Sequence, residues 1–247
     1  MQPTVSATHT TTREALHAVA CHVVARSRVA ATGRFGLRVT PGGFGTPEFG
    51  EAPQRVRVDG SLLVVESGAA SGASSRATSI DGATMATLAA FAGVDLGAAL
   101  SVGHDTPPMP PADARLAVAA ADAALLGEWF GVCSRALAQV LASVAAEHRP
   151  TMAQLWPEHF DIAIDTAYPH AASPGHRVNL GGSAGDAGHD HPYLYVGPWT
   201  PFRPGEPAFW NASFGATLSY EQIAAARDPL DASVAFFRRG LALLSAA

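Results

Sequence analysis

The sequence predicts an α+β protein with a mainly antiparallel sheet and packed helices. Short strand patterns and helical patterns follow one another without the regular strand–helix–strand order of a doubly wound fold. The dipeptide Asp59-Gly60 separates two alternating stretches, which is a strong hairpin signal. A helical pattern near residues 113–149 predicts one long helix.

The elements expected in the first half are two helices and three strands. The first helix opens at Thr11, with Glu14 as its capping-box partner, and ends at Gly33. The second helix spans residues 84–91 and ends at Gly93. Alternation of apolar and polar residues predicts the strands, which are 35–40, 54–59 and 62–66. The glycine-rich segments between them, 41–47 and 67–75, are expected to be turns or loops.

The elements expected in the second half are the long helix, four strands and two short helices. The long helix ends at Pro150, and a break near Gly127 or Gly131 is expected because an unbroken helix over 113–149 is long for one domain. The expected strands are 160–165, 177–180, 193–196 and 208–218. The expected helices are 220–226 and 230–244.

The composition is that of a globular protein with a sizeable core. Hydrophobic residues make up 48 % of the chain and charged residues 15 %. A length of 247 residues suits one large domain or two small ones that share a core, and because no convincing linker is present we expect a single α+β domain over residues 1–247. All 16 basic residues are arginine, which excludes Schiff-base chemistry and a lysine-dependent phosphate loop. Cys21 and Cys133 lie in apolar helical patterns and are expected to be buried thiols.

Charge and hydropathy indicate the partners and the compartment. The net charge of −5 comes without a basic stripe, so nucleic acid is not an expected partner. The polar segment 1–12 has no apolar core and does not have the pattern of a signal peptide. No run of about 18 apolar residues is free of charge, so no membrane association is expected. We expect a cytoplasmic protein, and the sequence does not specify its oligomeric state.

The first of two polar patches lies within residues 155–165. Its strand pattern places His159, Asp161 and Asp165 on one face and apolar side chains on the other. The apolar face is expected to pack on the core, so the polar face points to water or to a cavity. A separate pair, His104-Asp105, precedes a proline-rich segment and is interpreted as a hydrogen-bonded loop pair.

The second polar patch lies within residues 181–195. A glycine-rich loop runs into a strand pattern that places four side chains on one face, namely His189, His191, Tyr193 and Tyr195. If this strand is a neighbour of the strand of the first patch, the imidazoles, phenols and carboxylates converge.

The leading hypothesis is a small-molecule-binding protein or an enzyme, with a pocket between the 156–165 strand and the 181–199 segment. Backbone N–H groups of the glycine-rich loop would contact an anion, as turn-formed nests do. Aromatic side chains would form one wall of a mostly apolar pocket. The expected roles are polar or general-base contacts for Asp161 and Asp186, an anion contact for Arg177, and the wall for Tyr193, Tyr195 and Trp199.

The alternative is a metal-assisted hydrolase with a divalent metal, zinc or iron, as its cofactor. Two histidines and a carboxylate are a common ligand set, and the bound metal turns a water molecule into a nucleophile. The candidate ligands are His159, Asp161, His189 and His191. A third interpretation is a structural or interaction module without a site, in which these side chains are dispersed.

Four segments occur in a particular order along the second half of the chain. They are Trp156-Pro-Glu-His-Phe-Asp-Ile-Ala-Ile, Gly181-Gly-Ser-Ala-Gly-Asp, His191-Pro-Tyr-Leu-Tyr-Val-Gly-Pro-Trp-Thr-Pro and Ala216-Thr-Leu-Ser-Tyr-Glu. In this order they resemble an uncharacterised family of bacterial conserved-hypothetical proteins, common in actinobacteria, that carries a domain of unknown function.

The resemblance implies no particular activity and transfers no catalytic residue. The positions that match the family's pattern are Phe160, Asp161, Gly185 and Tyr195, and neither His189 nor His191 is among them. The resemblance therefore favours a shared pocket or core shaped by Trp156, Asp161 and Tyr195 over a shared metal site.

Overall fold

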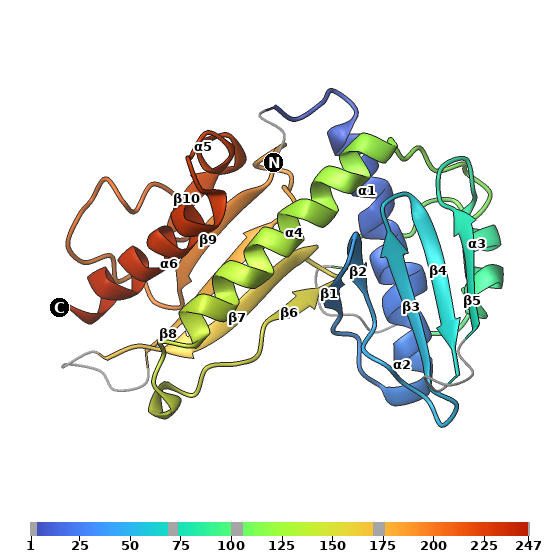
Figure 1. Cartoon of the computed structure of the whole chain (residues 1–247), viewed down its shortest axis with the longest axis horizontal. Coiled ribbons are helices and arrows are strands. Elements are labelled where there is room, and N and C mark those ends of the chain that lie inside the picture. The colour runs from blue at the N-terminus through green and yellow to red at the C-terminus, as the bar shows by residue number, and fades with distance from the viewer. Residues whose placement is uncertain (1–3, 69–73, 100–105, 170–175, 247) are drawn as a thin grey trace. The chain divides into compact units, whose positions relative to one another are not determined.

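The computed structural model describes residues 4–68, 74–99, 106–169 and 176–246. It contains helices and two five-stranded antiparallel sheets, with the strand orders β1-β2-β3-β4-β5 and β10-β9-β8-β7-β6 (Figure 1). This is the α+β class with antiparallel sheets that the sequence predicts. Among the helices described, none is both long and apolar enough to cross a lipid bilayer.

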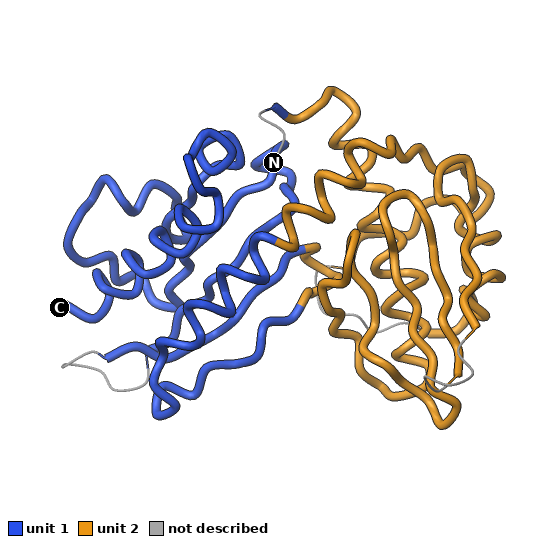
Figure 2. The backbone as a smooth tube through the Cα atoms, viewed as in Figure 1, with its two compact units in different colours: residues 1–4, 132–154, 161–247 blue, residues 5–131, 155–160 orange. Residues whose placement is uncertain are grey.

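The chain forms two compact units (Figure 2). Unit 1 comprises residues 1–4, 132–154 and 161–247, and unit 2 comprises residues 5–131 and 155–160. This division into compact units does not test the expectation of one domain over the whole chain, which stays a prediction.

The helices and strands follow one another in a mixed order. The helical segments are α1 (His9–Val19), the π-helix η1 (Ala20–Ala25), α2 (Arg26–Thr32), α3 (Met85–Ala92), α4 (Ala120–Leu141), the 3-10 helix η2 (Ala146–His148), α5 (Tyr220–Ala224) and α6 (Pro229–Ser245). The strands are β1 (Arg38–Thr40), β2 (Gly43–Gly45), β3 (Gln54–Asp59), β4 (Leu62–Ser67), β5 (Ser74–Ser79), β6 (Gln154–Trp156), β7 (Asp161–Ala167), β8 (Arg177–Ser183), β9 (Tyr193–Pro198) and β10 (Ala216–Ser219).

The first helical run of unit 2 extends without interruption from α1 through η1 to α2. It begins at His9, and Thr8 precedes it without a side-chain capping bond, so the capping box expected at Thr11 is wrong. It ends as predicted at Gly33, where φ is 68°, a left-handed conformation that glycine adopts without steric cost. All residues of η1 are buried, which makes this π-helical turn part of the core of unit 2.

Helix α4 is shorter than the predicted 113–149 helix, and it continues through both glycines at which a break was expected. At Gly127, a Cβ would lie 2.5 Å from the carbonyl oxygen of Gly42. This glycine therefore permits a close approach between the helix and the β1–β2 turn. Residues 113–119, before the helix, are irregular.

The β3–β4 hairpin at Asp59-Gly60 is confirmed, and its register runs from Gln54↔Ser67 to Asp59↔Leu62. Strand β5, by contrast, was not predicted, because Ser-Ser-Arg-Ala-Thr-Ser has no alternation of large apolar residues. Pairing with β4 along its whole length makes this polar segment the edge strand of the sheet.

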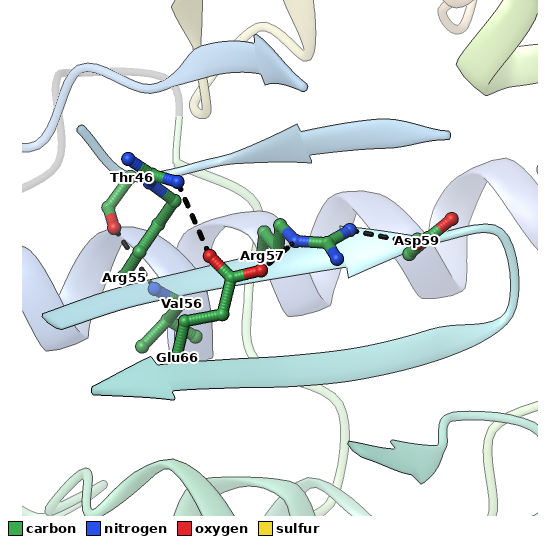
Figure 3. Close-up of polar contacts among 6 residues, drawn as sticks. All are labelled: Thr46, Arg55, Val56, Arg57, Asp59 and Glu66. Atoms are coloured by element: carbon green, nitrogen blue, oxygen red, sulfur yellow. Dashed lines mark hydrogen bonds and ion pairs between the residues drawn. The ribbon is translucent and has the colours of Figure 1, made fainter. Parts of the chain in front are cut away.

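The two faces of the β3–β4 hairpin differ in polarity. Valine and leucine side chains of one face are buried, whereas the other face carries an ion-pair network (Figure 3). Glu66 accepts hydrogen bonds from Nε of Arg57 at 2.9 Å and from Nη1 of Arg55 at 3.3 Å, and Arg57 also donates to Asp59 at 2.9 Å. The side chains at the centre of this network, Arg57 and Glu66, are only 18 % and 29 % exposed.

The sheet of unit 1 has one apolar face and one polar face. Helices α4 and α6 pack closely on the apolar face. A Cβ at Gly182 would lie 2.3 Å from Sγ of Cys133 in α4, and one at Gly240 in α6 would lie 2.9 Å from Val196. The buried side chains of this face are Ile162, Ile164, Val178, Leu180, Leu194 and Val196.

The strand expected over residues 208–218 is confined to β10. The residues before it form turns, in which Ala212 and Gly215 exchange backbone hydrogen bonds of 3.0 Å. Phe209 and Trp210 gave the segment a strand-like composition. Their rings pack edge to face, with centroids 4.9 Å apart, and do not alternate across a sheet.

Candidate functional site

The polar face of β7, β8 and β9 carries several of the predicted site residues. The strand register pairs Asp161 with Ser183 and Ser183 with Tyr193, and residues that pair directly point to the same face. Alternation along β9 adds Tyr195 to this face. We call these four residues, together with Asp186 in the loop after β8, the acid–phenol cluster.

The first acid of the cluster, Asp161, is bound by a phenol. The Tyr195 hydroxyl donates a hydrogen bond to Oδ2 of Asp161, which is only 7 % exposed. Burial raises the pKa of Tyr195 well above its ordinary value, and the charge of Asp161 and the hydrogen bond raise it further. Tyr195 therefore stays protonated and acts as a donor to the carboxylate.

The second acid, Asp186, accepts hydrogen bonds from its own loop and from Tyr193 at the start of β9. The hydroxyl of Tyr193 donates to Oδ2 at 2.5 Å, and the N–H groups of Gly188 and His189 donate to Oδ1 at 2.7 and 2.9 Å. Burial alone would raise the pKa of Asp186, but these hydrogen bonds and the nearby His189 lower it below its ordinary value. Asp186 is therefore an ionised acceptor at neutral pH.

The glycines of the second patch have a packing role. Gly181 and Gly182 lie in β8 and not in a loop. A Cβ at Gly181 would lie 2.5 Å from the Tyr195 ring on the polar face, and Gly182 allows the close approach of α4 on the other face. In the loop that follows, the N–H groups of Gly188 and His189 bond Asp186, an arrangement that does not favour an anion at these donors.

Arg177 and Trp199 form a second group on the polar face, apart from the acid–phenol cluster. Nε of Arg177 donates to Asp165 at 2.6 Å, and the guanidinium lies 5.8 Å from the Trp199 ring centroid. Trp199, 60 % exposed, donates its indole N–H to Oδ1 of Asn179 at 2.9 Å. The charge of Arg177 is thus paired with a carboxylate, while Trp199 offers a flat apolar surface to solvent.

The strand alternation expected for the first patch does not reach His159. Strand β7 begins at Asp161, and the preceding residues 157–160 form a turn in which Phe160 has φ 51°. His159 is an exposed residue of this turn and belongs to unit 2, whereas Asp161 belongs to unit 1. The prediction that His159 shares a strand face with Asp161 is therefore wrong.

The two histidines of the second patch lie before β9 and have separate partners. Nδ1 of His189 is 3.4 Å from Asp186, and its ring centroid is 4.4 Å from that of Tyr193. Nδ1 of His191 is 2.5 Å from Oε1 of Glu221. Within the described parts of the chain, no three His, Cys, Asp or Glu side chains are placed to hold a metal ion.

Three residues of this region, Asn179, Ser183 and Glu221, were not among the expected ligand-binding residues. Ser183 and Asn179 share the polar face with Arg177, and a period of two counted along β8 would have found both. Glu221 contacts His191 from α5, which is a long-range pairing with no local signal. The pair His104-Asp105 lies outside the described residues.

A polar group on the first helical run was also missed. Nε2 of His17 lies 3.2 Å from the carbonyl oxygen of Glu158, and the thiol of Cys21 donates to the carbonyl of Pro157 at 2.9 Å. Burial lowers the pKa of His17 from 6.5 to about 4 and raises that of Cys21. Both groups are therefore uncharged at neutral pH, and a buried thiol of this kind is unreactive.

Comparisons with known proteins add no family to this geometry. No protein-family model, no curated protein and no solved structure matches the chain. The chain is thus an α+β protein with an acid–phenol cluster on one sheet face, and its function must be argued from that face.

Proposed function

We propose that the chain is a small-molecule-binding protein whose ligand lies against the polar face of β7, β8 and β9. The observation that supports this is the acid–phenol cluster. Three consecutive strands and a loop contribute two carboxylates, two phenols and a hydroxyl to one face. Convergent polar groups from several elements are typical of ligand sites.

The chemistry of the cluster favours a ligand that donates hydrogen bonds. Asp186 is an ionised acceptor, and its side chain is 44 % exposed. The rings of Tyr193 and His189 lie beside it, and Trp199 presents an open ring on the same face. Hydroxyl or amine groups of a ligand would bind the acids, and a flat part of the ligand would stack on a ring.

The same residues would also serve a catalytic role if the bound ligand is a substrate. Asp161 or Asp186 would accept a proton from a bound ligand as a general base, in line with the sequence expectation. The protonated phenols of Tyr193 and Tyr195 would hold the carboxylates in position, since each donates to one of them.

A thermal-shift experiment tests the binding proposal. The probes are glucose, adenosine and spermidine, which carry hydroxyl, aromatic and amine groups, and a ligand that binds the folded state raises its Tm. Trp199 fluorescence, isolated by comparison with Trp199→Phe, reports whether the probe reaches the polar face.

The matched variants are Asp161→Asn, in the cluster, and Glu66→Gln, on the sheet of unit 2. A probe that stabilises the wild type and Glu66→Gln but not Asp161→Asn supports the proposal. A probe that stabilises all three equally binds elsewhere, and if no probe shifts Tm or the Trp199 signal, the polar face does not bind these classes of ligand.

Two further expectations join the proposal. We propose a cytoplasmic protein, which the two free and buried cysteines support, because thiols stay reduced in that compartment. We also propose membership of the actinobacterial family that the sequence resembles, on the strength of its motif order alone.

A further inference from the structure

A groove of about 470 Å³ lies in unit 1, where α6 meets the β10 edge of the sheet. It shares no residue with the acid–phenol cluster. Its volume is in the range of small-molecule sites, roughly 300–1,000 Å³. The lining residues used below are Phe209, Asn211, Leu218, Gln222, Phe236 and Arg239.

Apolar side chains form about half of the lining of the groove. The rings of Phe209 and Phe236 lie 5.4 Å apart between centroids, and each residue is 8 % exposed. Leu218 of β10 and two alanines of α6 continue this surface. An apolar ligand body of the width of an aryl ring or an alkyl chain suits these walls.

One end of the groove carries a positive charge. The guanidinium of Arg239 lies 5.4 Å from the Phe209 ring centroid, and it is bound by the carboxylate of Glu206. The side chains of Arg239 and Glu206 are 56 % and 53 % exposed. An ion pair this exposed is weak, so a carboxylate from outside can replace Glu206 at little cost.

The β10 edge is closed to an added peptide strand. The N–H of Thr217 donates to Oδ1 of Asn211 at 2.8 Å, and the N–H of Ser219 donates to Oε1 of Gln222 at 3.0 Å. An extended peptide would need these edge donors. The groove therefore suits a small molecule better than a peptide.

We propose that this groove binds an amphipathic carboxylic acid, with its carboxylate on Arg239 in place of Glu206 and its apolar part against the rings of Phe209 and Phe236. Glu206 then acts as an internal competitor, because its carboxylate occupies the position that the carboxylate of the ligand takes. This inference does not depend on the function proposed for the polar face.

Isothermal titration calorimetry with 3-phenylpropionate and octanoate tests the proposal, with the neutral 3-phenylpropionamide as a matched probe. We expect both acids to bind and the amide to bind about threefold more weakly, because it lacks the exposed ion pair with Arg239. Glu206→Gln should bind the acids about threefold more tightly, since the competitor is removed.

Arg239→Gln should weaken binding of the acids by about threefold and leave binding of the amide unchanged. The control is Arg238→Gln, the exposed neighbour outside the groove, which should bind like the wild type. Equal binding of acid and amide, unchanged affinity in both Glu206→Gln and Arg239→Gln, or no binding of either acid would each overturn the proposal. Because the substituted side chains are exposed, thermal melts of the variants should match the wild type.

Discussion

The hydroxyl of Tyr195 on β9 reaches the carboxylate of Asp161 on β7 by passing over the intervening strand β8. Gly181 makes this possible, because a Cβ at that position would lie 2.5 Å from the phenol ring and its oxygen. The hydrogen bond that joins two non-adjacent strands therefore depends on a missing side chain between them.

Replacement of Gly181 by alanine should displace the Tyr195 ring and break its bond to Asp161. We expect a loss of about 1–3 kcal/mol in the free energy of unfolding, as for an overpacked core position. Gly197→Ala on β9 is the control, because its Cβ would meet its nearest neighbour at 3.9 Å. Urea unfolding measures both variants, and an equal loss in the two would contradict the role given to Gly181.

The raised pKa values of Tyr193 and Tyr195 predict a stability loss in alkali. A phenol whose pKa is higher in the folded state than in the unfolded chain favours folding below its ordinary pKa near 10, and this contribution is lost as pH rises above it. In a titration at 295 nm, both phenols should ionise only when the protein unfolds. In the Tyr195→Phe variant, the rise in absorbance at 295 nm that accompanies unfolding should be smaller. If the absorbance change is lost instead at lower pH, before the protein unfolds, Tyr195 does not have the buried hydrogen bond.

Much of the fold was predictable because local patterns and tertiary packing agree in it. The Asp59-Gly60 hairpin, the stop at Gly33 and the two C-terminal helices follow from turn and capping chemistry. The missed strand β5 has no apolar pattern and exists through its pairing with β4. Helix α4 ends before residue 142 and continues through Gly127, where the close approach of Gly42 is a tertiary contact that no local pattern contains.

Strand alternation predicted the site residues that lie within a regular strand and failed for those that lie before a strand begins. Tyr193 and Tyr195 share a face because β9 covers both, and Asp161 joins them through the β7–β8–β9 register. His159 is excluded because Phe160 takes φ 51° and ends the alternation. The left-handed backbone conformation of Phe160 therefore removes His159 from the strand face that carries Asp161. A phenylalanine side chain does not indicate this conformation in the sequence.

Metal content is the test of the metal-assisted hydrolase alternative. The candidate ligands His189 and His191 have separate acidic partners, Asp186 and Glu221, so we expect no stoichiometric zinc or iron in protein purified without chelators. Elemental analysis, repeated after incubation with zinc, measures this. Near-stoichiometric metal that disappears in the His189→Ala/His191→Ala double variant would establish a metal site and direct further tests to hydrolase substrates.

Protonation of His17 should destabilise unit 2 in mild acid. Burial lowers the pKa of His17 from 6.5 to about 4, and its ring stacks on Phe160 at 5.1 Å between centroids. Because the folded state binds the proton more weakly than the unfolded chain, this contribution to stability is fully present above pH 6.5 and is lost as pH falls from there towards 4.

The expected loss between about pH 7 and pH 5 is about 2 kcal/mol from His17 alone, since one pKa unit corresponds to about 1.4 kcal/mol. Urea unfolding at the two pH values measures it. His17→Gln can still donate to the carbonyl of Glu158 but cannot titrate, so its stability should change less between these pH values. An unchanged pH dependence in His17→Gln would mean that another buried group destabilises the fold in acid.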